Sequence, residues 1–312
     1  MEQPLVSIVL PTYNGAAYLA KSIQSCIDQT YRNFELIIVD DNSSDATPEI
    51  IRSFVALDPR ISSTRNSPNQ KLPRSLNTGF ERAKGKYFTW TSDDNYYAPN
   101  ALEVMVQALE QNPDRILTYA NYTFIDENGT ITGTKSFGDV NESMVTWHGA
   151  GACFLYHADV HTRLNGYDPS AFLIEDYDFF IRALTLGKFH YLDRTDLYFY
   201  RHHSQSLSSL YGFYNFDLQK IVVERRLKQL LEISSPEDKQ RWLRKFAVYY
   251  GVTKSNHKRM NSYLQQLYTL SKSQTILTVG YIIVQKTIKT IGTGFSALWQ
   301  LIRLFTGGAK AA

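Results

Sequence analysis

The stretch LVSIVLPTYNGAAYLAKSIQSCIDQTYRNFELIIVD, residues 5–40, decides the fold class. LVSIVL and FELIIVD, at its two ends, are nearly unbroken apolar runs, which is typical of strands covered on both faces of a sheet. Between them Leu19, Ile23 and Cys26 recur at the spacing of one helix face, and Asn14 is placed to cap that helix. The stretch therefore predicts strand, helix and strand, the unit from which parallel sheets are built.

The same alternation continues along the chain. Thr47 and Pro48 are expected to be the N-cap and first residue of a second helix. Further elements are predicted over SLNTGFERAKG (75–85, helix), YFTWT (87–91, strand) and NALEVMVQALEQN (100–112, helix). This pattern predicts a mostly parallel, Rossmann-like α/β sheet flanked by helices.

Acidic residues follow two of these strands. FELIIVD runs into Asp40 and Asp41, and YFTWT is followed by Asp93 and Asp94. Ligands of such sheets lie beyond the carboxyl ends of the strands, so these residues are expected to share one crevice. Adjacent carboxylates repel unless one is protonated or a cation is present. A capped turn explains one such pair, but the recurrence favours a cation site.

Two familiar phosphate-binding loops are absent from the sequence. No GxGxxG follows the first strand, and no GxxxxGK[ST] occurs anywhere in the chain. A dinucleotide redox site and a P-loop are therefore not expected. Carboxylates without a glycine-rich cradle suit a nucleoside diphosphate that is held through a hard cation.

A third acidic group opens a helix predicted from IEDYDFFIRAL. Carboxylates stabilise a helix N-terminus, which is enough to explain Asp178. Glu175 and Asp176 lie between two apolar runs, and we interpret this pair as functional. Further on, the aromatic strand LYFY leads into Arg201, His202 and His203, and one of the two histidines is a candidate third metal ligand.

Composition limits the remaining possibilities. Cys26 and Cys153 show no metal-ligand spacing, so neither a disulfide framework nor a zinc site is expected. MEQPLVSIVLPTYN lacks the pattern of a secretory signal, which suggests the cytoplasm. Residues 1–210 hold 17 Lys and Arg against 25 Asp and Glu, whereas residues 211–312 hold 16 against 5. This asymmetry predicts a separate role for a basic C-terminal region.

Taken in order, four motifs resemble the inverting nucleotide-sugar glycosyltransferases of family 2, which have the GT-A fold. They are the stretch from SIVLPTYN to VDDNSSD, then LNTGFERAKGKYFTWTSDD, then GYD with IEDYDFFIRAL, and finally YRHHSQSLS. The resemblance covers about residues 4–208, so residues 1–210 are expected to form the catalytic domain. It implies transfer of a hexose from a UDP-sugar to a saccharide or lipid-linked acceptor, in cell-surface polysaccharide synthesis. No nucleic acid partner is expected.

The resemblance also implies roles for single residues. Asp176 would be the general base, and Glu175 would orient the acceptor. Asp94, in the TSDD version of the DXD motif, and His203 would hold Mn²⁺ or Mg²⁺. The nucleotide would contact Pro11, Thr12, Tyr13, Asp41, Lys71, Arg74 and Asp93, with Tyr13 against the base, Asp41 accepting from uracil N3 and Asp93 on the ribose. The chain departs from the family at Thr91, where the family often has Asp.

The implied chemistry needs few groups. Inverting transfer is one displacement at the anomeric carbon, with one base for the acceptor hydroxyl and a means of stabilising the departing diphosphate. Two other classes stay open. A sugar nucleotidyltransferase would need a basic loop where the chain has PTYNGAAY. A non-catalytic carbohydrate-binding module would use the aromatic residues, 13% of the chain, for stacking.

The tail, residues 239–312, contains 12 Lys and Arg and no acid. Its apolar run is broken by Gln285, Lys286 and Lys289, so it is too short to span a bilayer. As a helix it would present apolar residues beside lysines, namely Ile276, Val279, Tyr281, Ile283, Trp299, Leu301 and Phe305. That pattern is typical of a helix lying on an anionic membrane, here the inner face of the cell membrane. A helical subdomain packed on the core, or a dimer contact, is the alternative.

Overall fold

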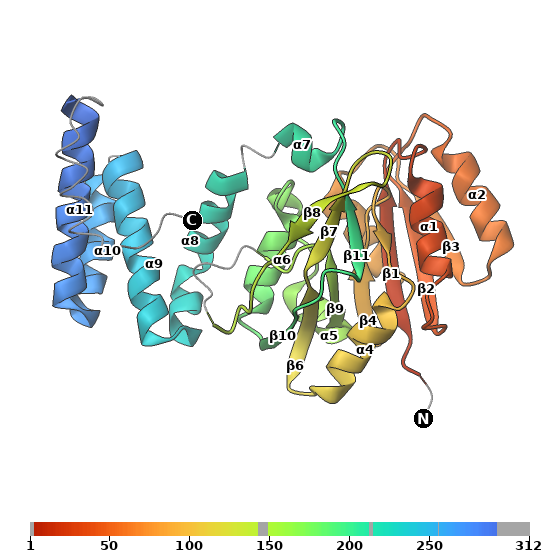
Figure 1. Cartoon of the computed structure of the whole chain (residues 1–312), viewed down its shortest axis with the longest axis horizontal. Helices are drawn as coiled ribbons and strands as arrows, with labels where there is room; N and C mark the ends of the chain where they lie inside the picture. The colour runs from red at the N-terminus through yellow and green to blue at the C-terminus, as the bar shows by residue number, and fades with distance from the viewer. Residues whose placement is uncertain (1–2, 143–148, 212–214, 255, 292–312) are drawn as a thin grey trace. The chain divides into compact units, whose positions relative to one another are not determined.

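The structure is a computed structural model, and it describes residues 3–142, 149–211, 215–254 and 256–291 (Figure 1). The chain divides into two compact units, residues 1–227 and 228–312. All the predicted site residues belong to the first unit. The division into a catalytic domain, 1–210, and a basic helical region, 211–312, stays a prediction.

The first unit is built on a seven-stranded sheet in the order β10-β6-β9-β4-β1-β2-β3. Its strands are β1 (Val6–Thr12), β2 (Phe34–Asp40), β3 (Ile61–Arg65), β4 (Tyr87–Trp90), β6 (Arg115–Ala120), β9 (Cys153–His157) and β10 (Lys188–Leu192). All neighbours pair in parallel except β9, which runs antiparallel to β4 and β6. The predicted mostly parallel α/β sheet is confirmed, although β3 was not predicted.

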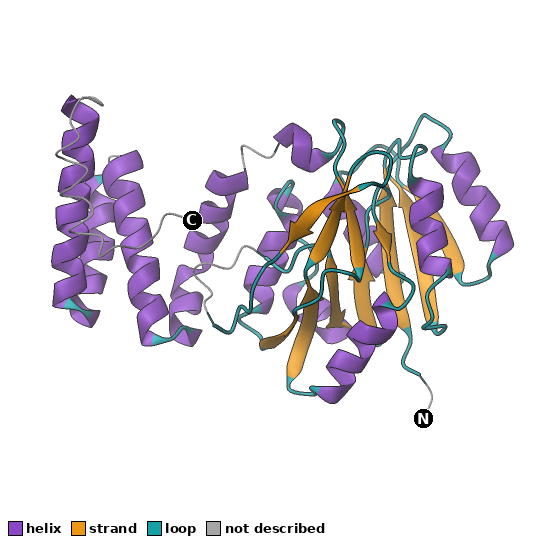
Figure 2. Cartoon of the chain, viewed as in Figure 1, coloured by secondary structure: helices purple, strands orange, loops and turns teal. Residues whose placement is uncertain are grey.

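Helices flank this sheet, as Figure 2 shows in purple. They are α1 (Leu19–Ile27), α2 (Thr47–Leu57), α3 (Leu72–Phe80), α4 (Ala101–Gln111), α5 (Ala158–Leu164) and α6 (Glu175–Ala183). Two expected caps are wrong. Asn14 lies well before α1, and Thr47 is already helical because the side chain of Asp45 accepts its backbone N–H at 3.0 Å. The third helix also begins earlier than expected, at Leu72.

A second, four-stranded sheet has the order β5-β11-β7-β8. It consists of β5 (Tyr96–Tyr97), β7 (Tyr122–Ile125), β8 (Ile131–Lys135) and β11 (Tyr198–Arg201). β5 follows directly after the Asp93–Asp94 pair, and β11 leads directly into the two histidines. Because β11 pairs with β5, this small sheet brings together two segments that are far apart in the sequence.

The second unit is helical. α7 (Leu207–Tyr211) and α8 (Asn215–Ile233) precede it, and α8 crosses the division between the units. α9 (Pro236–Val248), a π-helical turn (Tyr249–Thr253), α10 (His257–Leu270) and α11 (Lys272–Ile291) then pack through Trp242, Phe246, Leu267 and Ile282, all buried. None of the helices in the described part of the chain is long and apolar enough to cross a membrane.

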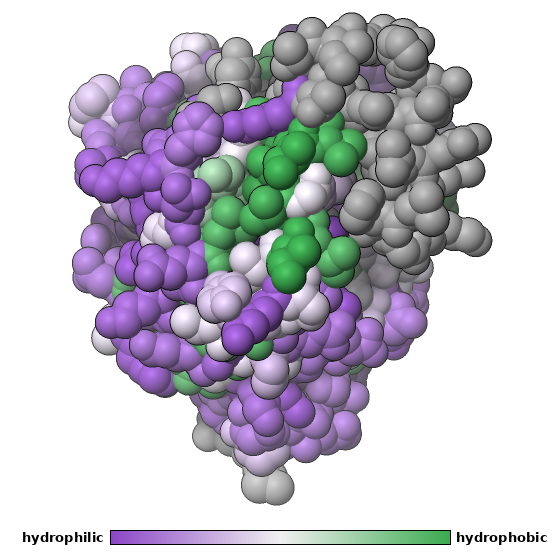
Figure 3. Space-filling view, turned by 90° about the vertical axis from the view of Figure 1, so that its left-hand side faces the viewer, coloured by the Kyte–Doolittle hydropathy of each residue, from purple (hydrophilic) through white to green (hydrophobic). Residues whose placement is uncertain are grey.

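One face of this unit carries a band of hydrophobic side chains (Figure 3). On α11, Ile276 is 70% exposed and Ile283 is 59% exposed. Three other apolar residues of the expected tail helix, Trp299, Leu301 and Phe305, lie outside the described residues, as does the side chain of Lys289.

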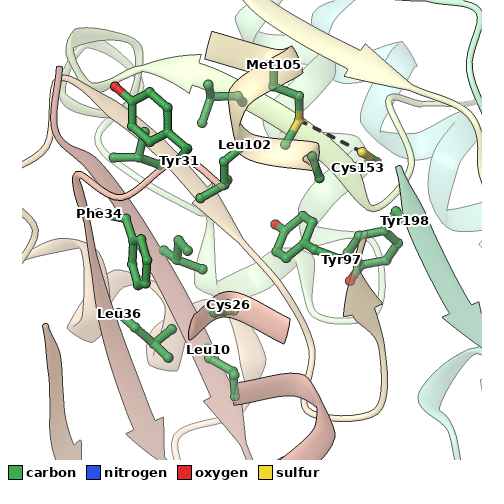
Figure 4. Close-up of a cluster of buried hydrophobic side chains, with 14 of the residues drawn as sticks. Leu10, Cys26, Tyr31, Phe34, Leu36, Tyr97, Leu102, Met105, Cys153 and Tyr198 are labelled. Atoms are coloured by element: carbon green, nitrogen blue, oxygen red, sulfur yellow. Dashed lines mark hydrogen bonds between the residues drawn. The ribbon is translucent and has the colours of Figure 1, made fainter. Parts of the chain in front are cut away.

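The core of the first unit lies between the main sheet and its helices. Figure 4 shows part of it, where Met105 of α4 packs towards Cys153 of β9. The Met105 and Cys153 sulfur atoms are 3.9 Å apart. Cys26 and Cys153 are both free and buried. The absence of a bond between them agrees with the sequence, and burial raises the pKa of the Cys26 thiol to about 12.

Candidate active site

The carboxyl ends of β2, β1 and β4 lie side by side, because these strands are neighbours in the main sheet. Thr12, the last residue of β1, is in register with Asp40, the last residue of β2. The Thr12 hydroxyl donates to Oδ2 of Asp93, beyond the end of β4, at 2.5 Å. The structure therefore gathers the polar residues that follow these strands at one edge, as the sequence predicts.

Close packing at this edge depends on Gly15, which sequence reasoning did not single out. A Cβ atom at this position would lie 2.1 Å from Oδ2 of Asp93 and 2.5 Å from the Thr12 hydroxyl oxygen. Any side chain would therefore displace the Thr12–Asp93 hydrogen bond. The signal available in the sequence was the glycine itself, directly after PTYN.

Asp93 and Asp94 differ in their surroundings. Burial, and secondly the charge of Asp94, raises the pKa of Asp93 to about 7. Asp94 is held by two side chains: the hydroxyl of Ser92 donates to its Oδ1 at 2.6 Å, and Nε2 of His203 lies 3.1 Å from its Oδ2. This hydrogen bond to Asp94 raises the pKa of His203 above its ordinary value. The structure thus brings together two residues predicted to hold a metal.

The donor set suits a divalent cation that is shared with a nucleotide. Within the described residues, no group of three or more His, Cys, Asp and Glu side chains forms a complete metal cage. Mg²⁺ in phosphate-transfer sites is typically held by one or two carboxylates together with substrate phosphates. Asp94 and His203 offer one carboxylate oxygen and one imidazole nitrogen close together, which fits such a shared site.

Thr91 points into the protein. Its side chain is fully buried, and its hydroxyl lies 2.7 Å from the hydroxyl of Tyr198. Residue 91 therefore serves the junction between the two sheets in this chain.

Asp41 is buried and holds the loop in front of α3. Its Oδ1 accepts from Nδ2 of Asn66 and from the backbone N–H of Gln70, both at 2.8 Å. Its Oδ2 accepts from the backbone N–H of Lys71 at 2.9 Å. Lys71 has a positive φ of 70° and lies at the N-cap of α3. The structure therefore brings Asp41 and Lys71 together through the backbone of Lys71.

The PTYN segment presents one large side chain. Pro11 and Thr12 are buried within β1, whereas the Tyr13 ring is 55% exposed. An exposed aromatic ring at the end of a central strand is a suitable surface for stacking a base. Arg74 lies within the first turn of α3, three residues after Lys71.

Glu175 and Asp176 begin α6, and both are desolvated. Burial, and secondly the charge of Asp176, raises the pKa of Glu175 to about 8. Burial also raises the pKa of Asp176. Glu175 accepts the backbone N–H of Leu173 at 2.8 Å, and Asp176 accepts that of Tyr177 at 2.6 Å. Two adjacent carboxyl groups with raised pKa values are a common sign of acid–base function.

The neighbouring acid, Asp178, has a structural role. It forms an ion pair with Arg182 at 2.7 Å, and the same guanidinium donates to the backbone carbonyls of Leu164 and Gly166. The helix is joined to the acidic edge by ring contacts, since Phe180 packs on Phe154, and Phe154 on Trp90 of β4. The first turn of α6 thus supplies a second carboxylate pair.

Residues 7–168 match the family model described as Glycosyl transferase family 2, over slightly more than half of the chain. The chain belongs to glycosyl transferase family 2. The matched residues include the PTYN segment, Asp41 and the Asp93–Asp94 pair. α6 and β11 lie beyond the matched region.

Relatives of this family 2 chain carry the same general description. An uncharacterized glycosyltransferase of Haemophilus influenzae is 38% identical over 129 residues, covering 41% of this chain and 51% of that protein. A second from the same organism is 28% identical over 291 residues, covering 88% and 89%. One from Rickettsia bellii is 29% identical, and the chain spans only 35% of its length. Several relatives are therefore much longer than the part that this chain matches.

Solved structures confirm the GT-A fold. S. aureus TarS 1–349 in complex with UDP has a TM-score of 0.60 at 14% identity, over 93% of each chain. Its complex with UDP-GlcNAc has a TM-score of 0.62 at 15% identity, over 90% of this chain and 81% of that one. Mannosyltransferase PcManGT from Pyrobaculum calidifontis, in complex with GDP-Man and Mn²⁺, has a TM-score of 0.54 at 15% identity, over 98% and 81%.

Proposed function

We propose that this chain is an inverting glycosyltransferase that moves a hexose from a UDP-sugar to a saccharide or lipid-linked acceptor. The observation that carries the proposal is the gathering of Thr12, Asp93, Asp94 and His203 at the ends of β1, β4 and β11. This arrangement occurs in a family 2 chain with the GT-A fold. The neighbours bound to UDP and UDP-GlcNAc support a UDP-sugar as donor.

At the donor end, Tyr13 stacks on the base and Asp93 binds the ribose. Asp41 accepts the uracil N3–H, although it already holds the loop in front of α3 through Oδ1 and Oδ2. Lys71 and Arg74 lie beside this loop and contribute positive charge towards the nucleotide. Asp94 and His203 hold Mn²⁺ or Mg²⁺, which would offset the negative charge of the departing diphosphate.

At the acceptor end, Asp176 is the general base. Its burial raises its pKa, so the ionised form is a stronger base than a solvated aspartate. Glu175 has a pKa of about 8, partly because of the charge of Asp176. Glu175 therefore favours its protonated form at neutral pH, and Asp176 takes the proton of the acceptor hydroxyl. No carboxylate nucleophile is required, since the displacement occurs in a single step.

A panel of nucleotide sugars tests the proposal. The full chain, supplied with Mn²⁺ and a UDP-, GDP- or CDP-sugar, is expected to release UDP from a UDP-sugar and to transfer the hexose when acceptors are added. Formation of a nucleotide sugar from a nucleoside triphosphate and a sugar phosphate would favour a nucleotidyltransferase instead. Binding of polysaccharide while every nucleotide sugar stays intact would favour a carbohydrate-binding module.

A divalent metal is required for donor binding under this proposal. Asp94→Ala is expected to remove the metal-dependent part of UDP affinity, and EDTA is expected to do the same in the parent. Calorimetric titration of UDP, with and without Mn²⁺, measures both effects. If the parent binds UDP equally well with and without Mn²⁺, the metal role of Asp94 and His203 is contradicted.

We also propose that the chain works in the cytoplasm, on the inner face of the cell membrane, in the synthesis of a cell-surface polysaccharide. The exposed apolar residues Ile276 and Ile283 lie on one face of α11, at a spacing of two helical turns. The region around them is basic, with no acid after Asp238. Apolar surface beside basic residues is complementary to anionic lipid, and a membrane-bound acceptor would give this contact a purpose.

A further inference from the structure

Arg201 ends β11 and is buried, yet no carboxylate of the described residues forms an ion pair with it. It is 4% exposed. Its guanidinium donates only to backbone carbonyls: Nε to Asp94 at 2.9 Å, and Nη1 to Asp126 at 3.0 Å and to Glu127 at 2.9 Å. A buried cation is costly unless its donors are satisfied. Its retention here, with hydrogen bonds to main-chain carbonyls and no paired carboxylate among the described residues, calls for a reason.

The carbonyls it binds belong to two separate loops. Asp94 lies in the loop between β4 and β5, and Asp126 and Glu127 lie in the turn between β7 and β8. One guanidinium therefore fixes the backbone of a metal-binding candidate against a turn of the second sheet. This contact acts on the main chain of Asp94, whereas Ser92 and His203 hold its side chain.

A second hydrogen bond holds the end of β11 to the loop between β4 and β5, which carries Asp93 and Asp94. The backbone N–H of Arg201 donates to Oδ1 of Asn95 at 2.7 Å, and Nδ2 of Asn95 donates to the hydroxyl of Ser92. Ser92 in turn donates to Asp94. Ser92, Asp94, Asn95 and Arg201 thus form a closed set of hydrogen bonds.

Tyr18 connects Arg201 to His203. The Arg201 guanidinium carbon lies 4.5 Å from the centre of the Tyr18 ring, and the His203 ring centre lies 5.2 Å from the same ring. Guanidinium groups stack favourably on aromatic faces. The position of the His203 ring therefore depends on Tyr18, which is itself held by Arg201.

We propose that Arg201 is a positioning residue that sets the separation of Asp94 and His203 for a divalent cation. The inference rests on the proposed function, because it concerns the metal site assigned there. Arg201 acts through the carbonyl of Asp94 and through Tyr18, and it does not itself touch the cation. Its planar fork can reach both loops at once, whereas a lysine ammonium carries the same charge at a single point.

A titration of the full chain with Mn²⁺ in saturating UDP tests this role. The electron paramagnetic resonance signal of free Mn²⁺ measures how much of the metal is bound. Arg201→Lys keeps the charge and loses the fork. Its Kd for Mn²⁺ is expected to rise about 10- to 100-fold, the usual effect of losing an outer partner of a metal ligand. UDP affinity without metal is expected to stay within twofold of the parent, because the contacts of Arg201 in the described part of the chain include none of the residues proposed to bind the nucleotide.

Arg182→Lys is the matched control. Arg182 is also buried, and it also donates to two backbone carbonyls, but these belong to Leu164 and Gly166 and not to residues 92–95. Its Kd for Mn²⁺ is expected to equal that of the parent. If Arg201→Lys binds Mn²⁺ with the same Kd as the parent, the proposal is overturned. It is also overturned if Mn²⁺ binding is weakened equally in Arg201→Lys and Arg182→Lys, since that would indicate a general loss of stability.

Tyr18→Leu decides the question if Arg201→Lys does not fold. Tyr18 is only half-buried, so the protein is expected to tolerate the change. Loss of its ring is expected to raise the Kd for Mn²⁺ several-fold, and an unchanged Kd would overturn the proposal. If the parent protein binds UDP but no Mn²⁺, the metal role in the proposed function is wrong as well. If the parent binds Mn²⁺ and the variants bind it equally well, only the role of Arg201 is wrong.

Discussion

Asp176 is the residue that we propose as the general base. It is desolvated at the start of α6, which raises its pKa, and burial also raises the pKa of its neighbour Glu175. A base gains strength from a raised pKa as long as it stays ionised at the working pH. Both carboxyl groups of the pair therefore have pKa values above those of solvated carboxyl groups.

Asp176→Asn is expected to abolish transfer while leaving UDP binding within about twofold of the parent. The amide keeps the size of the carboxyl group and cannot accept the proton, so kcat should fall by roughly 10²- to 10⁴-fold. Turnover measured beside calorimetric UDP binding separates the two effects. Turnover equal to that of the parent would place the base elsewhere.

Glu175→Gln is expected to stabilise the protein, and increasingly so as pH rises. The folded-state pKa of Glu175 is about 8, above its ordinary value, so its contribution to stability is greatest below about pH 4.5 and declines as pH rises through 8. Glutamine cannot ionise and avoids that decline, while its amide oxygen can still accept from Leu173.

Thermal unfolding of parent and Glu175→Gln between pH 5 and 9 measures the difference. The gap should widen towards pH 8 and then level off, reaching a few kcal/mol at most, since one pKa unit corresponds to about 1.4 kcal/mol. A gap that does not change with pH would show that Glu175 has an ordinary pKa.

The residues of the site were predictable where they follow a strand. Asp93, Asp94 and His203 stand at strand ends, and the structure brings Asp94 and His203 within hydrogen-bond distance. Nothing in the sequence indicates the role proposed for Arg201, because its hydrogen-bond acceptors are backbone carbonyls, which have no sequence signature. The loop contacts of Asp41 were invisible for the same reason, since two of its three donors are backbone N–H groups.

At the scale of elements, α3 approaches the main sheet closely at Gly79. A Cβ atom there would lie 2.4 Å from a methyl group of Val9 on β1 and 3.2 Å from one of Val39 on β2. Gly79→Ala is expected to lower the stability by about 1–2 kcal/mol, because overpacking costs about 1–3 kcal/mol and alanine recovers up to about 1 kcal/mol of helix propensity.

Gly280→Ala, in the middle of α11, is the control for this prediction. Nothing lies within 4 Å of a Cβ atom at Gly280. The substitution should therefore stabilise the second unit by roughly 0.5–1 kcal/mol. Chemical unfolding of both variants measures the changes. A Gly79→Ala protein as stable as the parent would show that α3 can shift away from β1 without cost.

Elements with a strong local pattern were predicted, and those defined by distant partners were not. β1, β2 and β4 are apolar runs, and α4 fits its expected range within one residue at each end. β3, with the sequence ISSTR, is an edge strand in which only Ile61 is buried. The insertion of β9 between β4 and β6 depends on pairing that no local pattern reports. α3 starts early because Asp41 binds the backbone just before it.

At the scale of the whole molecule, the C-terminal region differs from the rest of the chain, because it is basic and exposes the apolar residues Ile276 and Ile283. The full-length protein is expected to pellet with phosphatidylglycerol vesicles at low salt, and less at high salt, because exposed charges are screened. Ile276→Gln combined with Ile283→Gln should reduce pelleting without loss of fold, since both side chains are already mostly exposed.

Leu57→Gln provides the comparison, because Leu57 is 72% exposed on α2 in the first unit. This variant should pellet as the parent does. Equal pelleting of all three proteins would mean that the α11 face does not contact the membrane. Absence of pelleting by the parent would favour the alternative in which the tail packs on the core or on a second copy of the chain.

The pairing of β5 with β11 has a consequence for synthesis on the ribosome. Asp94 is translated 109 residues before His203, and Arg201 lies 107 residues after the carbonyl that it binds. At about 5–20 residues per second, the loop that carries Asp94 is synthesised roughly 5–20 s before Arg201 and His203. β1, β2 and β4 can pair within that interval, whereas the site itself cannot be completed. A nascent chain that stalls before β11 therefore carries adjacent carboxylates with neither the guanidinium nor the imidazole that holds them in the finished protein.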